Sequence, residues 1–399
     1  MPVAKLGSSM AQGSQDFDLV IVGAGPAGSA AAVTARRAGL TVALIDKAVF
    51  PRDKLCGGLV SGRSLKALER IFGARPSRDL FLVTRQMKFA WAGEELAQFR
   101  APHELWLTMR CDFDHVLFQA ALAAGAEDFT GQRWDVLDQG KNRITLKNGQ
   151  NLGFRALIGA DGATSPLAAQ LFGRAFDPAL VGFGIESECA RNPADPAVTV
   201  VDFGASKWGY GWYFPKQGSL TVGVCGLQSQ NPDWKATLSA FMPEGVEGQR
   251  MKGALLPFGD FRRKPGRGNI LLVGDAAGLV DSLTGEGIAF ALESGAMAAD
   301  AVAQVLAKGK PDTAAKAYFR ALKGIHSELA RVGKLRQIVF SKRFEPMFRE
   351  KLKNSKRLRQ VFFDLIEGDL TYLELEKMIA GGVLSKLGTG ISGWWPGRG

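Results

Sequence analysis

Cysteine and histidine are scarce in this chain of 399 residues, with four and three copies. The cysteines are scattered, and none forms a CxxC pair or a cluster with histidine: Cys56, Cys111, Cys189 and Cys225. The missing clusters argue against a structural zinc site, and a chain of this size has no need of a disulfide framework. We therefore expect no metal site and a reducing, cytoplasmic setting.

Long hydrophobic runs are also missing. No apolar stretch reaches about 18 residues, so the sequence predicts no membrane-spanning helix. Residues 1–16 are small and polar and contain no apolar core, which predicts a flexible tail and not a signal peptide.

Positive charge is abundant and unevenly placed. The net charge is +11, and residues 316–359 hold 14 lysines and arginines against three acids, which accounts for all of it. This basic segment predicts an anionic partner: phospholipid head groups, a pyrophosphate-bearing substrate or nucleic acid. A solvated helix surface is the alternative. We expect no nucleic-acid partner, because the phenylalanines in the segment have the spacing of core residues: Phe340, Phe344 and Phe348.

A glycine-rich turn near the N-terminus is the strongest motif. The run from Asp18 to Ser29 predicts a buried strand, a GxGxxG turn and a helix, and a second strand ends at Asp46. This arrangement is typical of dinucleotide binding, with pyrophosphate at the helix N-terminus and ribose on the acid. The candidate cofactor residues here are Gly23, Gly25, Pro26, Ala27, Gly28, Asp46 and Lys47. A second GxGxxG, Gly388–Gly393, lacks a preceding strand and is a coincidence.

The pattern along the chain predicts an α/β fold with an interrupted nucleotide-binding domain. Buried-strand segments recur at 17–47, 155–162 and 269–275, while residues 180–226 alternate as an antiparallel sheet does. We expect strands at 80–84 and 87–91, and a strand at 105–110 leading into a helix at 112–124. The last 80 residues are mostly helical, with one apolar stripe from Leu322 to Val339.

Four motifs in this order resemble FAD enzymes of the p-hydroxybenzoate hydroxylase type. They are GAGPAG at 23–28, Arg110 before a helix, GADG at 159–162 and GDAAG at 274–278. Three longer strings are similar to the geranylgeranyl reductase family: residues 50–58, 209–216 and 274–288. The resemblance covers residues 17–300 and implies a Rossmann-like FAD-binding domain (17–79, 105–179 and 265–310). It also implies an inserted antiparallel-sheet substrate domain (80–104 and 180–264) and a basic helical C-terminal region (311–399).

The resemblance also implies further cofactor-binding residues: Arg52, Arg110, Asp161, Gly162, Gly274, Asp275, Gly285, Glu286, Gly287 and Ile288. Alternatives from the residues themselves remain open. Asp275 is also suited to cap the N-terminus of a helix. Asp161-Gly162 is also typical of a plain turn, and Arg110 could instead form an ion pair with Asp112 or Asp114. Ser282 stands where the family usually has proline.

The segment from Arg52 to Gly58 carries the candidate catalytic residues Lys54, Cys56, Gly57 and Gly58. Two cations near a flavin stabilise its anionic reduced ring, and two glycines let a ring or polyene pass close to the backbone. The family places this cysteine at the active site, where Cys56 either donates a proton or shapes the cavity. A small buried hydrophobic residue is the alternative.

An aromatic string precedes Pro215. At a period of two, Trp208, Tyr210, Trp212 and Phe214 share one face of a strand, which predicts an apolar wall for an isoprenoid chain. Ordinary sheet core is the alternative.

The function implied is FAD-dependent reduction of carbon–carbon double bonds in a geranylgeranyl-type isoprenoid or another apolar substrate. The alternative is an FAD-dependent monooxygenase or halogenase acting on an aromatic or polyene substrate. NAD(P)H or a ferredoxin-type protein is expected as electron donor. The basic segment and Trp394-Trp395 predict a peripheral site on an anionic membrane, at its inner face.

Overall fold

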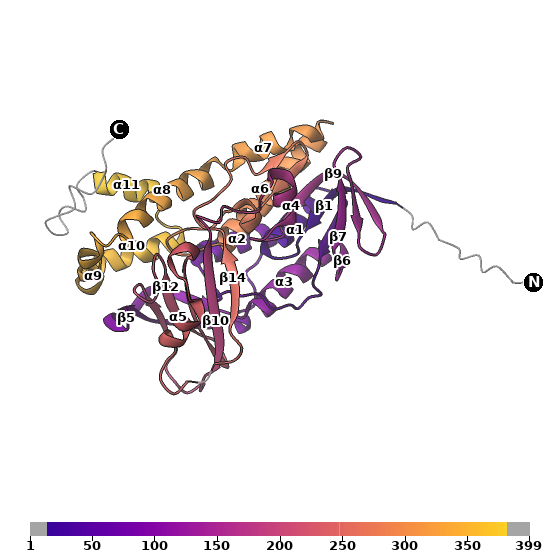
Figure 1. Cartoon of the computed structure of the whole chain (residues 1–399). Helices are drawn as coiled ribbons and strands as arrows, with labels where there is room; N and C mark the ends of the chain where they lie inside the picture. The colour runs from indigo at the N-terminus through magenta and orange to yellow at the C-terminus, as the bar shows by residue number, and fades with distance from the viewer. Residues whose placement is uncertain (1–13, 247, 381–399) are drawn as a thin grey trace, which may run out of the picture.

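The computed structural model describes residues 14–246 and 248–380, which form two sheets and a set of C-terminal helices (Figure 1). The first sheet has the strand order β15-β16-β9-β1-β2-β6, with β8 pairing to β9 and β7 to β8. Its strands are β1 (Gln15–Val22), β2 (Val42–Asp46), β6 (Glu127–Thr130), β7 (Trp134–Asp138), β8 (Arg143–Leu146), β9 (Asn151–Gly159), β15 (Gly266–Arg267) and β16 (Ile270–Leu272).

The second sheet has the order β14-β10-β13-β12-β11-β4-β5-β3. All its pairings are antiparallel except that of β11 with β4. Its strands are β3 (Leu59–Val60), β4 (Leu82–Trp91), β5 (Glu94–Leu107), β10 (Gly182–Ala190), β11 (Val198–Asp202), β12 (Tyr210–Pro215), β13 (Ser219–Leu227) and β14 (Lys252–Leu256).

Eleven helices lie within the described residues, besides short 3-10 turns. They are α1 (Pro26–Arg37), α2 (Gly62–Phe72), α3 (Arg110–Ala123), α4 (Pro166–Phe172), α5 (Trp234–Phe241), α6 (Ile288–Leu306), α7 (Ala314–Ala321), α8 (Lys323–Val339), α9 (Glu345–Asn354), α10 (Lys356–Glu367) and α11 (Tyr372–Ala380).

The nucleotide-binding half has a parallel core. β1 pairs in parallel with both β2 and β9, and β9 pairs in parallel with β16. The last four residues of β1 are buried, because helices cover the sheet. Small residues let α1 and α6 approach closely: a Cβ on Gly295 would lie 2.1 Å from the carbonyl oxygen of Ala27. The predicted α/β fold with its interrupted nucleotide domain is confirmed.

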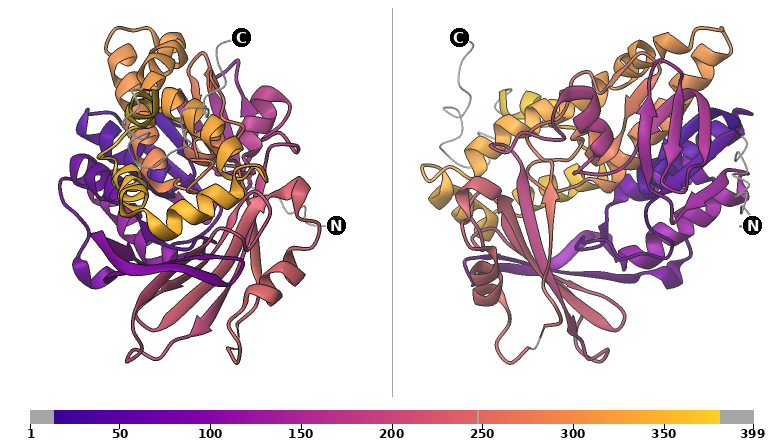
Figure 2. Two further views of the ribbon diagram at one scale, coloured as in Figure 1. Left: turned by 90° about the vertical axis from the view of Figure 1, so that its left-hand side faces the viewer. Right: turned by 45° about the vertical axis from the view of Figure 1, so that its right-hand side comes forward.

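C-terminal helices cover part of the second sheet. Figure 2 shows the yellow helices α9 and α10 over one face of that sheet, and both contact β5. The apolar stripe of α8 is buried at Ile325, Leu329, Val332 and Val339, as expected. Phe348 packs against Trp91 and Phe203, and Phe340 packs against Trp208. Both phenylalanines are half-buried and lie against the core.

Several predicted boundaries were wrong. β1 begins at Gln15, inside the expected tail, because Gln15 and Asp16 pair with Leu152 and Gly153. The two strands expected at 80–84 and 87–91 are one strand, β4, with a register shift between Thr84 and Gln86. β5 continues in the second sheet to Leu107, so the domain boundary expected at residue 105 lies inside a strand, and α3 already begins at Arg110. Residues 1–13, Gly388–Gly393 and Trp394-Trp395 lie outside the described residues.

Helix α6 is long and apolar, whereas the sequence predicted no membrane-spanning helix. Among the described residues, α6 alone is long and apolar enough to cross a membrane, and 67% of its apolar window is buried inside the protein. Glu293 and Asp300 interrupt its apolar run. Because α6 packs against α1, α2 and α7, it is a core helix of this fold.

Candidate active site

The glycine turn between β1 and α1 is built for close approach. Gly23 has φ +106°, and a Cβ there would lie 2.2 Å from the carbonyl oxygen of Ala160. A Cβ on Gly28 would lie 1.7 Å from the carbonyl oxygen of Gly23. Gly25 provides no side chain to cap α1, and Pro26 occupies the first turn. The N-terminus of α1 is thus an uncapped positive helix end, which suits a phosphate group.

Asp46 ends β2 beside this turn. Its Oδ2 accepts a hydrogen bond from the Ala24 N–H at 2.9 Å, and its Oδ1 accepts one from the Ala48 N–H at 2.9 Å. The carboxylate therefore fixes the glycine turn and stays half-exposed, whereas Lys47 is exposed. The interaction of Asp46 with a ribose remains a prediction.

Arg52 and Arg110 converge on one buried carboxylate. Arg110 forms a bidentate ion pair with Asp114 at 2.7 and 2.8 Å, and Arg52 Nη2 lies 3.1 Å from Asp114 Oδ2. The structure therefore shows the alternative interpretation of Arg110, an ion pair with Asp114. This ion pair is buried and does not lie on the surface. Two cations share one carboxylate, so this corner carries a net positive charge.

Arg52 provides a direct test of whether the site fits a dinucleotide. Its Nη1 is buried and has no hydrogen-bond partner among the described residues. Its Nη2 would lie 3.2 Å from a Cβ on Gly25. A buried guanidinium N–H without an acceptor is costly, and a phosphate oxygen at the glycine turn satisfies it. The residues at this turn therefore fit the pyrophosphate of FAD.

Asp161 follows β9 at the same edge of the sheet. Its Oδ2 accepts a hydrogen bond from the Leu167 N–H at 3.2 Å, and its Oδ1 is buried with no partner in the described part of the chain. Burial raises the pKa of Asp161 to about 6. Gly162 takes φ +82°, as a tight turn requires. Asp161 Oδ1 is therefore an acceptor available to a ligand donor at this turn.

The GDAAG segment packs against the first turn of α1. Gly274 has φ +54°, donates its N–H to Ser294 Oγ at 2.9 Å, and would place a Cβ 3.2 Å from that of Ala27. Asp275 lies within a short 3-10 turn, Gly274–Ala277, and not at the N-cap of α6, which begins at Ile288. A Cβ on Gly287 would lie 3.6 Å from Asp275 Oδ1, so Asp275 faces the next loop.

Two tyrosines from distant elements hold the loop before α6. Tyr210 Oη on β12 donates to the Thr284 carbonyl oxygen at 2.6 Å, and Tyr372 Oη on α11 donates to Asp281 Oδ2 at 2.6 Å. Gly285 has φ +73° and would place a Cβ 2.5 Å from Tyr210 Oη. Ser282, at the position where the similar family usually has proline, is buried, and its hydroxyl has no partner within residues 14–246 and 248–380. We call residues 281–287 the flavin loop, because Gly285–Gly287 are predicted to contact the cofactor.

Glu286 in the flavin loop has a structural contact that the motif did not predict. Its Oε1 accepts from the Ala289 N–H at 2.9 Å, so the carboxylate caps the N-terminus of α6, and Ser64 Oγ lies 3.4 Å from the same oxygen. Burial raises the pKa of Glu286. Contact between Glu286 and a cofactor remains a prediction.

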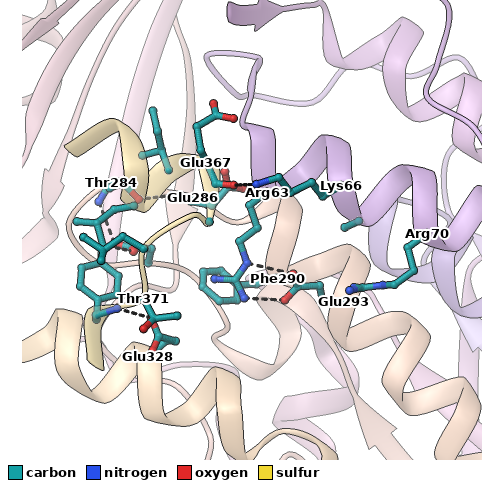
Figure 3. Close-up of a pocket in the computed structure, with 17 residues that line it drawn as sticks. Arg63, Lys66, Arg70, Thr284, Glu286, Phe290, Glu293, Glu328, Glu367 and Thr371 are labelled. Carbon is teal, nitrogen blue, oxygen red and sulfur yellow. Dashed lines mark hydrogen bonds and ion pairs between the residues drawn. The ribbon is translucent and has the colours of Figure 1, made fainter. Parts of the chain in front are cut away.

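The flavin loop also borders a cavity of about 280 Å³ between α2, α6 and the C-terminal helices (Figure 3). Arg63 crosses it, paired with Glu293 at 2.7 Å and lying over the Phe290 ring. The cavity shares Asp281, Thr284 and Glu286 with the flavin loop. Its walls are rich in charges of both signs, unlike the apolar wall predicted for a lipid chain.

The segment 56–58 packs tightly against β12. A Cβ on Gly57 would lie 2.7 Å from the Phe214 ring and 3.0 Å from Trp212 Nε1. Gly58 has φ +75°, and a Cβ there would lie 2.0 Å from the Thr108 carbonyl oxygen. The expectation that these glycines leave space for a ligand was therefore incomplete: protein neighbours already require glycine here. Cys56 Sγ accepts from the Gly58 N–H at 3.4 Å and lies within hydrogen-bonding reach of Arg110.

Three of the four predicted wall residues form one aromatic row. The rings of Tyr210 and Trp212 are 6.0 Å apart, and those of Trp212 and Phe214 are 6.2 Å apart. The prediction for Trp208 was wrong, because this residue precedes β12 with φ +57°, which breaks the strand alternation. Its ring packs near Phe340 and its carbonyl oxygen accepts from Arg336 Nη2 at 2.9 Å.

Two buried charged residues at this site were missed. Glu186 on β10 accepts from the Cys56 N–H at 3.1 Å, and the Lys216 ammonium donates to the Gly57 carbonyl oxygen. Both side chains are almost fully buried. Burial lowers the pKa of Lys216 to about 8. A glutamate directly after the apolar residues 182–185 of β10 was the available signal. Lys54, which was predicted, is only half-buried.

The chain matches known families and structures over most of its length. A family model of FAD-dependent oxidoreductases matches residues 18–124, and a model of tryptophan halogenases matches residues 103–359. A menaquinone reductase of Mycobacterium tuberculosis is 30% identical over 76% of this chain and 81% of its own length. A geranylgeranyl diphosphate reductase of Rhodobacter capsulatus is 30% identical over 74% of this chain and 77% of its own length.

A solved structure supports the same fold. The crystal structure of a geranylgeranyl bacteriochlorophyll reductase-like protein from Thermoplasma acidophilum has a TM-score of 0.71 at 22% identity, over 94% of this chain and 99% of that one. The fold and these matches together define an FAD-dependent oxidoreductase. Within that class, the chain belongs to the geranylgeranyl reductase family, and it is an enzyme whose cofactor is FAD.

Proposed function

We propose that the protein reduces carbon–carbon double bonds in the prenyl chain of an isoprenoid lipid. The observation that carries this proposal is the aromatic row of Tyr210, Trp212 and Phe214, two of whose rings pack against the Cys56–Gly58 segment. An apolar wall directly beside the predicted catalytic segment suits a chain that has no polar groups to bind. The two relatives described above are named as reductases of menaquinone and geranylgeranyl diphosphate, both of which carry prenyl chains.

Bound FAD, once reduced, supplies a hydride for this reaction. The residues of this chain provide position and charge. Arg52 and the N-terminus of α1 bind the pyrophosphate, while Tyr210 and Tyr372 fix the flavin loop. We assign Lys54, Cys56, Gly57 and Gly58 to the place where the reacting end of the prenyl chain would bind. The buried cation of Lys216, bonded to Gly57, stabilises negative charge at that end.

The membrane and the electron donor are further parts of this proposal. Residues 316–359 bring exposed cations to the outside of the C-terminal helices, namely Lys342, Arg343, Lys353, Lys356 and Arg357. Such a surface attracts anionic head groups, which would hold the enzyme where prenyl lipids reside. NAD(P)H or a ferredoxin-type protein supplies the electrons in this scheme, and the site is cytoplasmic at the inner face of the membrane.

A monooxygenase or halogenase is the second candidate, because a tryptophan halogenase model matches residues 103–359. Product analysis separates the two. The purified enzyme is incubated with menaquinone or with geranylgeranyl diphosphate and a chemical reductant, in parallel under argon and in air. Our proposal expects, under argon, a product in which one double bond of the prenyl chain has gained two hydrogens, which is distinct from reduction of the quinone ring. A product that forms only in air and gains one oxygen, or a halogen when halide is added, supports the second candidate instead.

A further inference from the structure

Glu186 is a buried carboxyl group in contact with the candidate catalytic segment. It lies in β10 with 8% of its surface exposed, and its Oε1 accepts from the Cys56 N–H at 3.1 Å. Its Oε2 is buried and has no hydrogen-bond partner among the described residues. A buried carboxylate normally has both oxygens satisfied, so a half-satisfied one points to an unfilled role.

The charges around Glu186 come from each neighbouring segment. Lys216, after β12, is buried and lies close enough to interact electrostatically. On β14, Lys252 is the register partner of Glu186 and forms an ion pair with Asp53. Glu188, two residues further along β10, accepts from Thr221 Oγ1 on β13 at 2.9 Å. The register partner of Glu186 on β13 is Gly223, which carries no charge.

We propose that Glu186 is the acid that delivers the proton in alkene reduction, a role that rests on the proposed function. In this step the π bond breaks, and one alkene carbon receives a hydride from the reduced flavin. The other carbon receives the proton of the Glu186 carboxyl group, which is left as a carboxylate. The oxidised flavin and the saturated carbon pair balance the electrons, and a solvent proton restores Glu186.

The environment of Glu186 suits both halves of this cycle. Burial raises the pKa of Glu186 to about 7, so a large share of the carboxyl groups hold a proton near neutral pH. After transfer, the ammonium group of Lys216 stabilises the new carboxylate. Cys56, the other candidate acid, lies next to Glu186, and its Sγ accepts a hydrogen bond from the Gly58 N–H at 3.4 Å.

The test compares wild type with Glu186→Gln in single turnovers under argon, using chemically reduced enzyme and geranylgeranyl diphosphate or menaquinone. We expect the substitution to slow lipid-dependent flavin reoxidation by roughly 10²–10⁴-fold while FAD content and lipid affinity are retained. The wild-type rate should fall as pH rises through about 7, and this fall should be absent in the variant. Glu186→Asp, which keeps an acid, should retain part of the rate and the pH dependence.

Two further measurements separate a proton donor from a structural residue. The infrared difference spectrum of the protein on alkaline titration should lose a protonated carboxyl band, and Glu186→Gln should lack that band at every pH. Glu188→Gln removes the same charge nearby and serves as the matched control. It should keep the maximum rate and shift the fall to lower pH, because Glu188 raises the pKa of Glu186.

Each outcome is decisive. Wild-type rate and pH profile in Glu186→Gln, or no titrating carboxyl band, would overturn the assignment of Glu186 and leave the proposed function intact. A wild-type enzyme that saturates neither lipid would overturn the proposed function, and the role of Glu186 with it.

Discussion

Gly28 shows how strictly single residues define the cofactor turn. A Cβ at Gly28 would lie 1.7 Å from the Gly23 carbonyl oxygen, which is backbone and does not yield. Gly28→Ala must therefore open the turn, and we expect a loss of about 2–4 kcal/mol in stability and a protein purified without bound flavin. The ratio of flavin to protein absorbance measures this. Gly218→Ala, at a position with nothing within 4 Å, should retain full flavin content, and equal losses in both would refute the account of the turn.

The pH dependence of stability also belongs to single residues. Burial raises the pKa of Glu186 from 4.5 to about 7 in the folded state. Both states are protonated below about 4.5, so the folded protein keeps its full stability there, and it loses stability as pH rises to about 7. The loss is about 3 kcal/mol. Denaturant titrations should show this decrease in wild type relative to Glu186→Gln, and parallel curves for the two proteins would contradict it.

At the scale of elements, β12 links the second sheet to the flavin loop. Tyr210→Phe removes the hydrogen bond to the Thr284 carbonyl oxygen, which costs about 1 kcal/mol. Because that bond holds the loop, we also expect weaker FAD retention in dialysis. Tyr213→Phe is the matched control on the same strand, since Tyr213 Oη bonds the Phe241 carbonyl oxygen at 2.6 Å, away from the loop. It should lose similar stability and keep its flavin.

The sequence predicts such elements well where the signal is local. The glycine turn, β2 ending at Asp46, and the alternation of Tyr210, Trp212 and Phe214 are all read from short-range patterns. The position of Trp208 could not be predicted in this way. Its positive φ is imposed by tertiary contacts, and such a φ leaves no periodic pattern in the sequence.

Partners far apart in the chain could not be predicted. Glu186 and Lys216 reach the Cys56–Gly58 segment across 130 and 159 residues of sequence. Tyr372 reaches the flavin loop across 91 residues. The order of the motifs was enough to predict FAD as the cofactor. The charges around the Cys56–Gly58 segment depend on how the second sheet packs against that segment, which the motifs do not reveal.

At the scale of the whole molecule, the basic C-terminal region divides its charges between structure and surface. Arg331 pairs with Glu376, Arg349 pairs with Glu94, and Arg336 is buried. Lys353, Lys356 and Arg357 are exposed on neighbouring helices. If they face a membrane, replacing all three with glutamine should weaken binding to phosphatidylglycerol vesicles by about 1 kcal/mol per charge.

The control removes three exposed lysines elsewhere, Lys141, Lys147 and Lys235. Sedimentation with vesicles at low and high salt measures both variants. We expect the C-terminal variant alone to lose binding to the vesicles. Equal losses in the two variants would show that binding depends on net charge and not on the C-terminal surface.

The central claim is that a reduced flavin in this protein passes its electrons directly to a prenyl double bond. Mixing the fully reduced enzyme with a prenyl lipid in a stopped-flow instrument under argon tests it most directly. We predict that the oxidised flavin spectrum returns with one saturated bond formed per flavin. A flavin that stays reduced until oxygen is admitted would contradict the claim.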